Sequence, residues 1–195
     1  MTSADAVTVT SVAGRRPQRA DARRNYEKLL AIAGEAFAED SAVTLEAIAR
    51  RADVGIGTLY RHFPSRPALL EAIYVGQVEE LCRSARELSA TLSPWDALVQ
   101  WLHRYVGYVG TKHALAEQLT ASIGQPTAVF GNCRQALFAE GEPLLARAQE
   151  AGAVRPDVGF EDVLRLVSGI TMVKFSDERQ MDRVLGVALD GLRAR

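Results

Sequence analysis

Apolar residues at helical spacing run along almost the whole chain. In residues 21–39 they recur three and four positions apart, at Tyr26, Leu29, Leu30, Ala33 and Phe37. This spacing is typical of the buried face of an amphipathic helix. Similar stripes continue toward the end of the chain, and no sustained alternation of apolar and polar residues interrupts them. The pattern predicts an all-α fold of about nine helices.

Capping residues, prolines and glycines indicate where these helices begin and end. Thr44 and Ser65 are hydroxyl N-caps, and Pro67 fits the first turn, where a missing N–H is tolerated. Gly152 is a C-terminal glycine in the expected place. The expected helices cover residues 21–39, 45–52, 56–62, 66–89, 95–109, 113–123, 126–152, 160–175 and 177–195.

The two shortest predicted helices, 45–52 and 56–62, lie only a few residues apart. Helices shorter than about 12 residues are marginal in water, so each needs a surface to pack on. The helix at 21–39 can supply that surface. A short helix, a tight turn and a second short helix form a helix-turn-helix, whose second helix presents its N-terminus and outer face to a major groove.

The start of this second helix carries residues suited to DNA. Gly55 and Gly57 leave its first backbone N–H groups open to a phosphate. Thr58 offers a hydroxyl to a phosphate and a methyl group to a thymine. Three further side chains could reach a base edge or the backbone from the outer face: Tyr60, Arg61 and His62. The alternative is an ordinary helical bundle in which Gly-Ile-Gly is only a turn.

The stretch TLEAIARRADVGIGTLYRHFPSRPALLEAI, residues 44–73, resembles the DNA-binding segment of the TetR family of bacterial transcriptional regulators. Members of that family share the pattern T-hydrophobic-x-x-I-A-x-x-A-G-V-S-x-G-T-L-Y-x-H-F-x-S-K-x-x-L. The match covers about fifty residues of this chain. By this resemblance Arg66 replaces a lysine that touches phosphate. The residues expected to contact double-stranded DNA are Thr44, Gly55, Ile56, Gly57, Thr58, Tyr60, Arg61, His62 and Arg66.

Three positions depart from the family pattern. Asp53 stands where glycine is usual, Gly55 where a capping serine is usual, and Ile56 at a position that is often polar. Loss of the serine hydroxyl removes one cap and one phosphate contact, an effect of about 1 kcal/mol. Ile56 can contact a thymine methyl group but cannot hydrogen-bond to a base edge. Direct base readout is therefore expected to be sparse, and the operator sequence is not predictable.

The resemblance implies three regions. Residues 1–20 are expected to form a flexible basic arm, 21–66 the helix-turn-helix DNA-binding domain, and 67–195 a helical ligand-binding and dimerisation domain. The arm is either a solvated tail or a segment that touches phosphates or a minor groove, through Arg15, Arg16 and Arg19. The apolar stripes of the last two helices would pair with a second subunit. Such a homodimer reads two half-sites of a palindromic operator.

A small-molecule site is expected in the C-terminal domain from the candidate residues taken together, although for each residue taken singly plain core packing is the favoured interpretation. Ligand sites are mostly apolar cavities with a few polar groups. The expected lining is Trp101, His103, Tyr105, Tyr108, Phe130, Cys133, Phe138 and Met172. His103 is the polar group expected to face the ligand. No metal site is expected, because His113 lies ten residues away without carboxylates or thiolates at ligand spacing.

Composition and charge change this interpretation little. The 195 residues are 48% hydrophobic, enough for a substantial core, and the formal net charge is −1. Residues 1–66 carry 10 basic and 8 acidic side chains (net +2) and the remainder 13 and 16 (net −3), which favours nucleic-acid contact at the N-terminal part. Cys82 and Cys133 are expected to be buried thiols. No signal peptide or apolar run of about 20 residues is visible, so a cytoplasmic location is expected.

Three functional hypotheses follow. The first is a ligand-responsive transcriptional repressor that binds a palindromic operator as a homodimer and is released by a small-molecule effector. The second is a helical small-molecule-binding or interaction protein that has lost specific DNA binding, which Gly55 and Ile56 would favour. The third is an enzyme, which is disfavoured because no nucleophile–base pair, paired carboxylates or metal signature is visible. No cofactor is expected.

Overall fold

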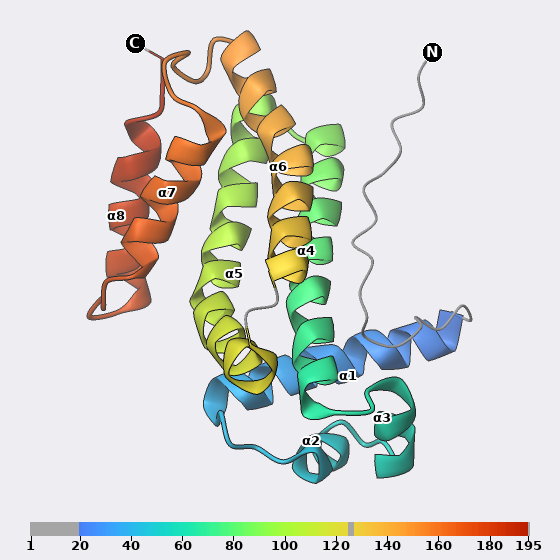
Figure 1. The fold of residues 1–195 in the computed structure, drawn as a ribbon. Helices are drawn as coiled ribbons and strands as arrows, with labels where there is room; N and C mark the ends of the chain where they lie inside the picture. Colours follow the sequence, from blue (N-terminus) through green and yellow to red (C-terminus); the bar gives the residue numbers. More distant parts are fainter. Residues whose placement is uncertain (1–19, 125–126, 195) are drawn as a thin grey trace. The chain divides into compact units, whose positions relative to one another are not determined.

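A computed structural model describes residues 20–124 and 127–194, which form eight helices and, within these ranges, no strand (Figure 1). The expected all-α fold is confirmed. The expected arm lies outside the described residues, apart from Ala20 in the first helix. The helices are α1 (Ala20–Glu39), α2 (Leu45–Arg51), α3 (Ile56–His62), α4 (Arg66–Thr91), α5 (Pro94–Ile123), α6 (Thr127–Glu150), α7 (Phe160–Thr171) and α8 (Glu178–Asp190).

The described residues form eight helices where about nine were expected, because the expected helices at 95–109 and 113–123 are a single helix. This helix, α5, is 30 residues long and passes through Gly110 without a break. One glycine inside a helix is unfavourable by about 1 kcal/mol, but it does not end the helix without a cap or a proline. Thr111 continues the helix, and its hydroxyl donates a hydrogen bond to Gln77 Oε1 of α4 at 3.2 Å.

The last two helices are shorter than expected. α7 ends at Thr171 rather than at residue 175, and α8 ends at Asp190 rather than at residue 195. The predicted N-cap of α8 is confirmed, since the Asp177 carboxylate accepts a hydrogen bond from the backbone N–H of Gln180 at 2.7 Å.

The chain divides into two compact units. Unit 1 comprises the described residues up to Val78 together with Thr111–Cys133, and unit 2 comprises Glu79–Gly110 together with the described residues from Arg134 onward. Helices α4, α5 and α6 each contribute residues to both units. These units describe packing, and the functional boundary expected after residue 66 remains a prediction.

Unit 1 has a core formed by the first three helices, to which parts of α4 and α5 add side chains. The predicted stripe of α1 is buried as expected, from Tyr26 to Phe37. α2 and α3 lie against each other, and α2 also lies against α1 (Figure 1). Three large apolar side chains of this region are fully buried: Ile48, Leu59 and Phe63. Two helices that could not persist alone are therefore stabilised by packing on α1.

Unit 2 is organised around Trp101 of α5. The indole is fully buried, its N–H donates to the carbonyl of Leu81 at 3.0 Å, and its ring stacks on Tyr105 with centroids 5.7 Å apart. Phe160, at the start of α7, packs against the same indole at 5.7 Å. α7 and α8 lie side by side in this unit (Figure 1).

Candidate nucleic-acid interface

The helix-turn-helix is built by two caps and a left-handed turn residue. The Thr44 hydroxyl accepts a hydrogen bond from Ala47 N–H at 3.2 Å and so caps α2. Asp53, in the turn, has a φ of +56°, the left-handed conformation that glycine adopts most easily. This conformation explains why a glycine is usual at that position. Gly55 then serves as the N-cap of α3 without a side-chain hydrogen bond.

The beginning of α3 is bare. A β-carbon added to Gly57 would meet no heavy atom within 4 Å, and one added to Gly55 would lie 3.9 Å from the Thr58 hydroxyl oxygen. Gly55 has a φ of −64° and a ψ of 137°, which any residue can adopt. The chain's own packing therefore requires no glycine at either position. The openness leaves room for another molecule to approach the backbone here.

Most of the expected DNA-contacting side chains lie on the exposed surface of this region. Thr44, Gly55, Gly57 and Arg61 are exposed, Tyr60 and Ile56 are 44% and 38% exposed, and Thr58 is half-buried. Ile56 and Tyr60 are two of the large hydrophobic side chains that the described chain leaves exposed. The structure thus leaves most of the residues that the sequence grouped exposed at or near α2 and α3.

Two of these side chains have partners within the protein. The Arg61 guanidinium folds back along α3, where it donates to the Gly57 carbonyl and to the Thr58 hydroxyl, both at 3.1 Å. It must leave these acceptors before it can reach a base edge. The Tyr60 hydroxyl donates to Glu46 Oε1 at 3.4 Å. The pairing of Tyr60 with Glu46 had no signal in the sequence, because the two residues are on different helices.

His62 and Arg66 are placed differently from the rest of the expected set. His62 is half-buried, and its ring lies edge-on to Tyr26 with centroids 5.7 Å apart. The Arg66 guanidinium is half-buried and points into unit 1, where it donates to the backbone carbonyls of Ser41 and Val43. Both side chains are therefore less exposed than Tyr60 and Arg61 of α3.

Arg51, at the end of α2, is engaged in ion pairs with α1. Its guanidinium donates to Glu39 at 2.9 Å and to Glu35 at 3.3 Å. The hydrogen bond from Arg51 lowers the pKa of Glu39, and the same bond raises the pKa of Arg51. These exposed pairs contribute little to stability. They do, however, neutralise one of the cations that flank the helix-turn-helix.

The expected ligand-binding residues divide between the two units, and their role in ligand binding remains a prediction. Trp101, Tyr105, Tyr108 and Phe138 belong to unit 2, whereas Phe130 and Cys133 belong to unit 1. Phe130 packs on Tyr74 at 5.1 Å, and Cys133 is fully buried.

His103 and Met172 are both exposed, Met172 to 73%. His103 follows Trp101 by two residues, and two residues turn a helix by about 200°, so the side chain faces away from the aromatic cluster. His103 is therefore not part of that cluster, and its contact with a ligand remains a prediction. The cluster has a polar neighbour in Ser168 of α7, whose hydroxyl lies 3.1 Å from the Tyr105 hydroxyl. Nothing in the sequence pattern pointed to Ser168.

Two further properties concern only the described part of the chain. No group of three or more histidine, cysteine, aspartate or glutamate side chains there could hold a metal ion. No described helix is both long enough and apolar enough to span a membrane.

An all-helical chain with an open second helix in a helix-turn-helix defines the class of DNA-binding regulators. Residues 30–73 match the family described as "Bacterial regulatory proteins, tetR family". Residues 93–194, more than half of the chain, match the family described as "Transcriptional regulator SbtR-like, C-terminal domain". The chain therefore belongs to the TetR family of bacterial transcriptional regulators. This family consists of DNA-binding regulators and not of enzymes, so the enzyme hypothesis is discarded.

Solved structures and a curated relative agree with this assignment. The TetR transcriptional regulator SCO0520 from Streptomyces coelicolor is 38% identical, with a TM-score of 0.77 over 86% of this chain and 98% of that one. A TetR regulatory protein from Mycobacterium vanbaalenii is 35% identical, with a TM-score of 0.75 over 91% and 100%. The HTH-type transcriptional repressor KstR of Mycolicibacterium smegmatis is 37% identical over 94 residues, which are 48% of this chain and 45% of the repressor. The match thus spans less than half of the length of that relative.

Proposed function

We propose that this chain is a ligand-responsive transcriptional repressor that binds a palindromic operator as a homodimer and is released by a small-molecule effector. The observation that carries the proposal is the presence of two uncovered surfaces of different chemistry. One is the bare beginning of α3 in unit 1, and the other is an apolar face of α7 and α8 in unit 2. The first suits a DNA backbone, and the second suits a second copy of the chain.

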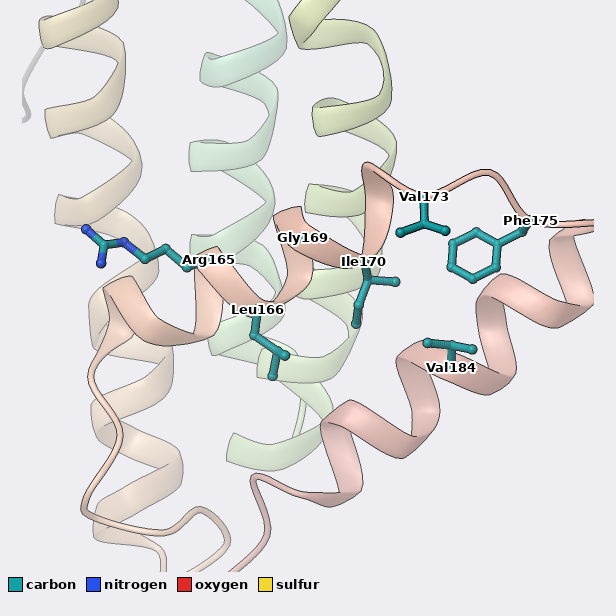
Figure 2. Close-up of a pocket in the computed structure, with 7 residues that line it drawn as sticks. All are labelled: Arg165, Leu166, Gly169, Ile170, Val173, Phe175 and Val184. Atoms are coloured by element: carbon teal, nitrogen blue, oxygen red, sulfur yellow. The ribbon is translucent and has the colours of Figure 1, made fainter.

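The apolar face contains a groove of about 460 Å³ (Figure 2). Leu166 and Ile170 line it from α7, Val184 lines it from α8, and the segment between the helices adds Val173 and Phe175. Val173 is 61% exposed, and Val187, farther along α8, is 75% exposed. Several large apolar side chains are thus exposed on this pair of helices, and homodimer interfaces are rich in such residues.

Dimerisation also supplies what one helix-turn-helix lacks. A single α3 is seven residues long and can touch only a few base pairs. A two-fold dimer places two such helices on half-sites about 34–36 Å apart, or a multiple of that distance, so the operator repeats with inverted symmetry. The two half-site contacts act together, which raises affinity by about 100-fold or more over one contact.

Repression and release by an effector are the remaining parts of the proposal. The name of the relative KstR supports repression. Helices α4, α5 and α6 contribute residues to both units, so a ligand that binds unit 2 acts on helices that also form unit 1. Such a ligand changes DNA affinity only if it binds one conformation better than another. The chromosome of a bacterium lies in its cytoplasm, which is where we infer that this protein acts.

The dimer face can be tested with a double variant, Val173→Glu with Val184→Glu. Buried unpaired carboxylates oppose association, so the variant is expected to be a folded monomer in analytical ultracentrifugation. Its affinity for an operator selected from random duplex DNA should fall by about 100-fold or more. The matched control is Asp182→Lys, an exposed charge change on the same helix. A variant that stays dimeric, or a monomer with unchanged affinity, contradicts the proposal.

The effector can be sought by mass spectrometry of small molecules released when the purified protein is denatured. A candidate obtained in this way should weaken operator binding when it is added back to the protein. A bound molecule that leaves operator affinity unchanged at saturation contradicts its role as the effector.

A further inference from the structure

Arg66 is the first residue of α4, and its guanidinium is surrounded by protein groups of unit 1. Nη1 donates to the Val43 carbonyl, and Nη2 donates to the Ser41 carbonyl and, at 3.4 Å, to Gln118 Oε1 of α5. The guanidinium carbon also lies 4.5 Å from the centre of the Phe37 ring of α1. One side chain therefore contacts α1, α5 and the loop between α1 and α2.

The two backbone acceptors belong to the loop that leads into the helix-turn-helix. This loop runs from the end of α1 to Thr44, the residue that caps α2. Within it, the Asp40 carboxylate accepts from Ala42 N–H at 2.8 Å, and Val43 N–H donates to the Asp40 carbonyl at 3.1 Å. The bonds from Arg66 tie this local turn to the start of α4. Arg66 therefore contacts the residue directly before Thr44, the N-cap of α2.

An arginine can make these contacts together, whereas a lysine cannot. The guanidinium is a planar fork whose N–H groups reach two carbonyls at once while its face lies on an aromatic ring. A lysine ammonium is a compact point charge without a flat face. Gln118 Oε1 provides a third acceptor, which the same guanidinium reaches together with the two carbonyls.

We propose that Arg66 is a positioning residue for DNA binding and not a phosphate contact. It holds the α1–α2 loop, and with it the N-terminus of α2, against α4 and α5 in the arrangement that binds the operator. This inference rests on the operator binding proposed above. It replaces the role that the resemblance assigned to this position, because three of the five guanidinium N–H donors are already directed to protein acceptors.

Salt dependence of operator affinity separates the two roles, because each phosphate contact that is lost flattens the log–log slope by about one. The test uses full-length wild type, Arg66→Lys and Arg66→Ala. If Arg66 positions the loop, both variants lose affinity by about tenfold or more at every salt concentration, with the wild-type slope. If Arg66 contacts phosphate, Arg66→Lys keeps wild-type affinity and Arg66→Ala shows a flatter slope. Either of these results overturns the proposal.

Hydrogen exchange measured without DNA is a second test, which does not depend on operator binding. In Arg66→Lys, the backbone amides of Val43 and Ala47 should exchange faster than in wild type, while amides of α7 and α8 keep their protection. Unchanged exchange at Val43 and Ala47 overturns the proposal. If no selected duplex binds even the wild type, the proposed function fails, and the hydrogen-exchange test still decides whether Arg66 positions the loop. If Arg66→Ala does not fold, Arg66→Lys alone decides both the salt-dependence test and the hydrogen-exchange test.

Discussion

Two glycines, one in each unit, occupy opposite environments. Gly57, at the bare beginning of α3, has no atom within 4 Å of the place where a β-carbon would stand. Gly141, on α6, is buried, and a β-carbon there would lie 2.3 Å from Phe160 Cζ and 3.0 Å from Trp101 Cη2. The packing of unit 2 excludes any side chain at Gly141, whereas nothing in unit 1 excludes one at Gly57.

A glycine inside a helix can serve the packing of the protein itself or the approach of another molecule, and the two environments distinguish these reasons. At Gly141 the small residue lets α6 approach the aromatic side chains of α5 and α7, so its effect is on stability. At Gly57 the glycine is unfavourable for the helix by about 0.5–1 kcal/mol relative to alanine, and no contact within the chain offsets this. The effect of Gly57 is therefore expected in what binds to α3.

The largest expected effect is on stability, from Gly141→Ala. Phe160 cannot swing away from the new methyl group, because it packs on both Trp101 and Phe138, so the variant should lose about 1–3 kcal/mol in urea unfolding. The matched control is Gly131→Ala on the same helix, where a β-carbon meets no atom within 4 Å. The control should be unchanged or more stable. Equal stability of Gly141→Ala and wild type would show that unit 2 packs less tightly than the structure indicates.

The next effect is on operator affinity, from Gly57→Ala and Gly57→Leu. Neither variant should be less stable, and the alanine should stabilise α3 by about 0.5–1 kcal/mol. Affinity for the operator should fall by about tenfold for alanine, which is about 1.4 kcal/mol, and further for leucine, because each side chain holds the DNA away from the backbone. Fluorescence anisotropy measures both. Wild-type affinity of Gly57→Leu would show that this surface is not the interface.

A smaller effect is expected at Asp53. Its φ of +56° is a backbone conformation that favours glycine. Asp53→Gly should stabilise the protein by about 0.5–1 kcal/mol, because an L-residue in the left-handed region is strained. Asp53→Ala is the control and should destabilise by a similar amount, since alanine tolerates this region less well than aspartate. Urea midpoints of the three proteins should therefore rank Gly above Asp above Ala.

The smallest expected effect is on the ionisation and reactivity of Cys82, a buried thiol of unit 2. Burial raises the pKa of the Cys82 thiol from 9.0 to about 11. Because the folded-state pKa is higher, the contribution of this thiol to stability is complete below pH 9 and is lost as pH rises toward 11. At pH 8 native Cys82 should resist iodoacetamide, whereas it should react in urea, as followed by peptide mass spectrometry. Equal labelling rates would show that this part of unit 2 opens readily.

Local signals were sufficient for the helix-turn-helix. The Thr44 hydroxyl predicted the cap of α2. The spacing of Ile48 and Leu59 predicted the buried face, and Gly55 and Gly57 predicted the exposed beginning of α3. Each of these features depends on residues within a few turns of helix, so a single sequence contains them. The expected break within α5 has no decisive local signal, since Gly110 is compatible with both a break and a continuous helix.

The partners of individual side chains could not be predicted where contacts join distant segments. The sequence placed the Arg66 cation at a phosphate, because that position carries a cation in the family. Its partners Ser41, Val43 and Gln118 lie up to 52 residues away, and only folding brings them to it. The same holds for Ser168, which meets Tyr105 across 63 residues.

Taken alone, the amino-acid order determined the helical class, the position of the helix-turn-helix and the family, because periodicity and capping act over a few residues. The tertiary structure decided which side chains are free to meet DNA and which are held by the protein. Side-chain availability depends on hydrogen-bond partners and burial supplied by remote parts of the chain, and a linear pattern does not contain them.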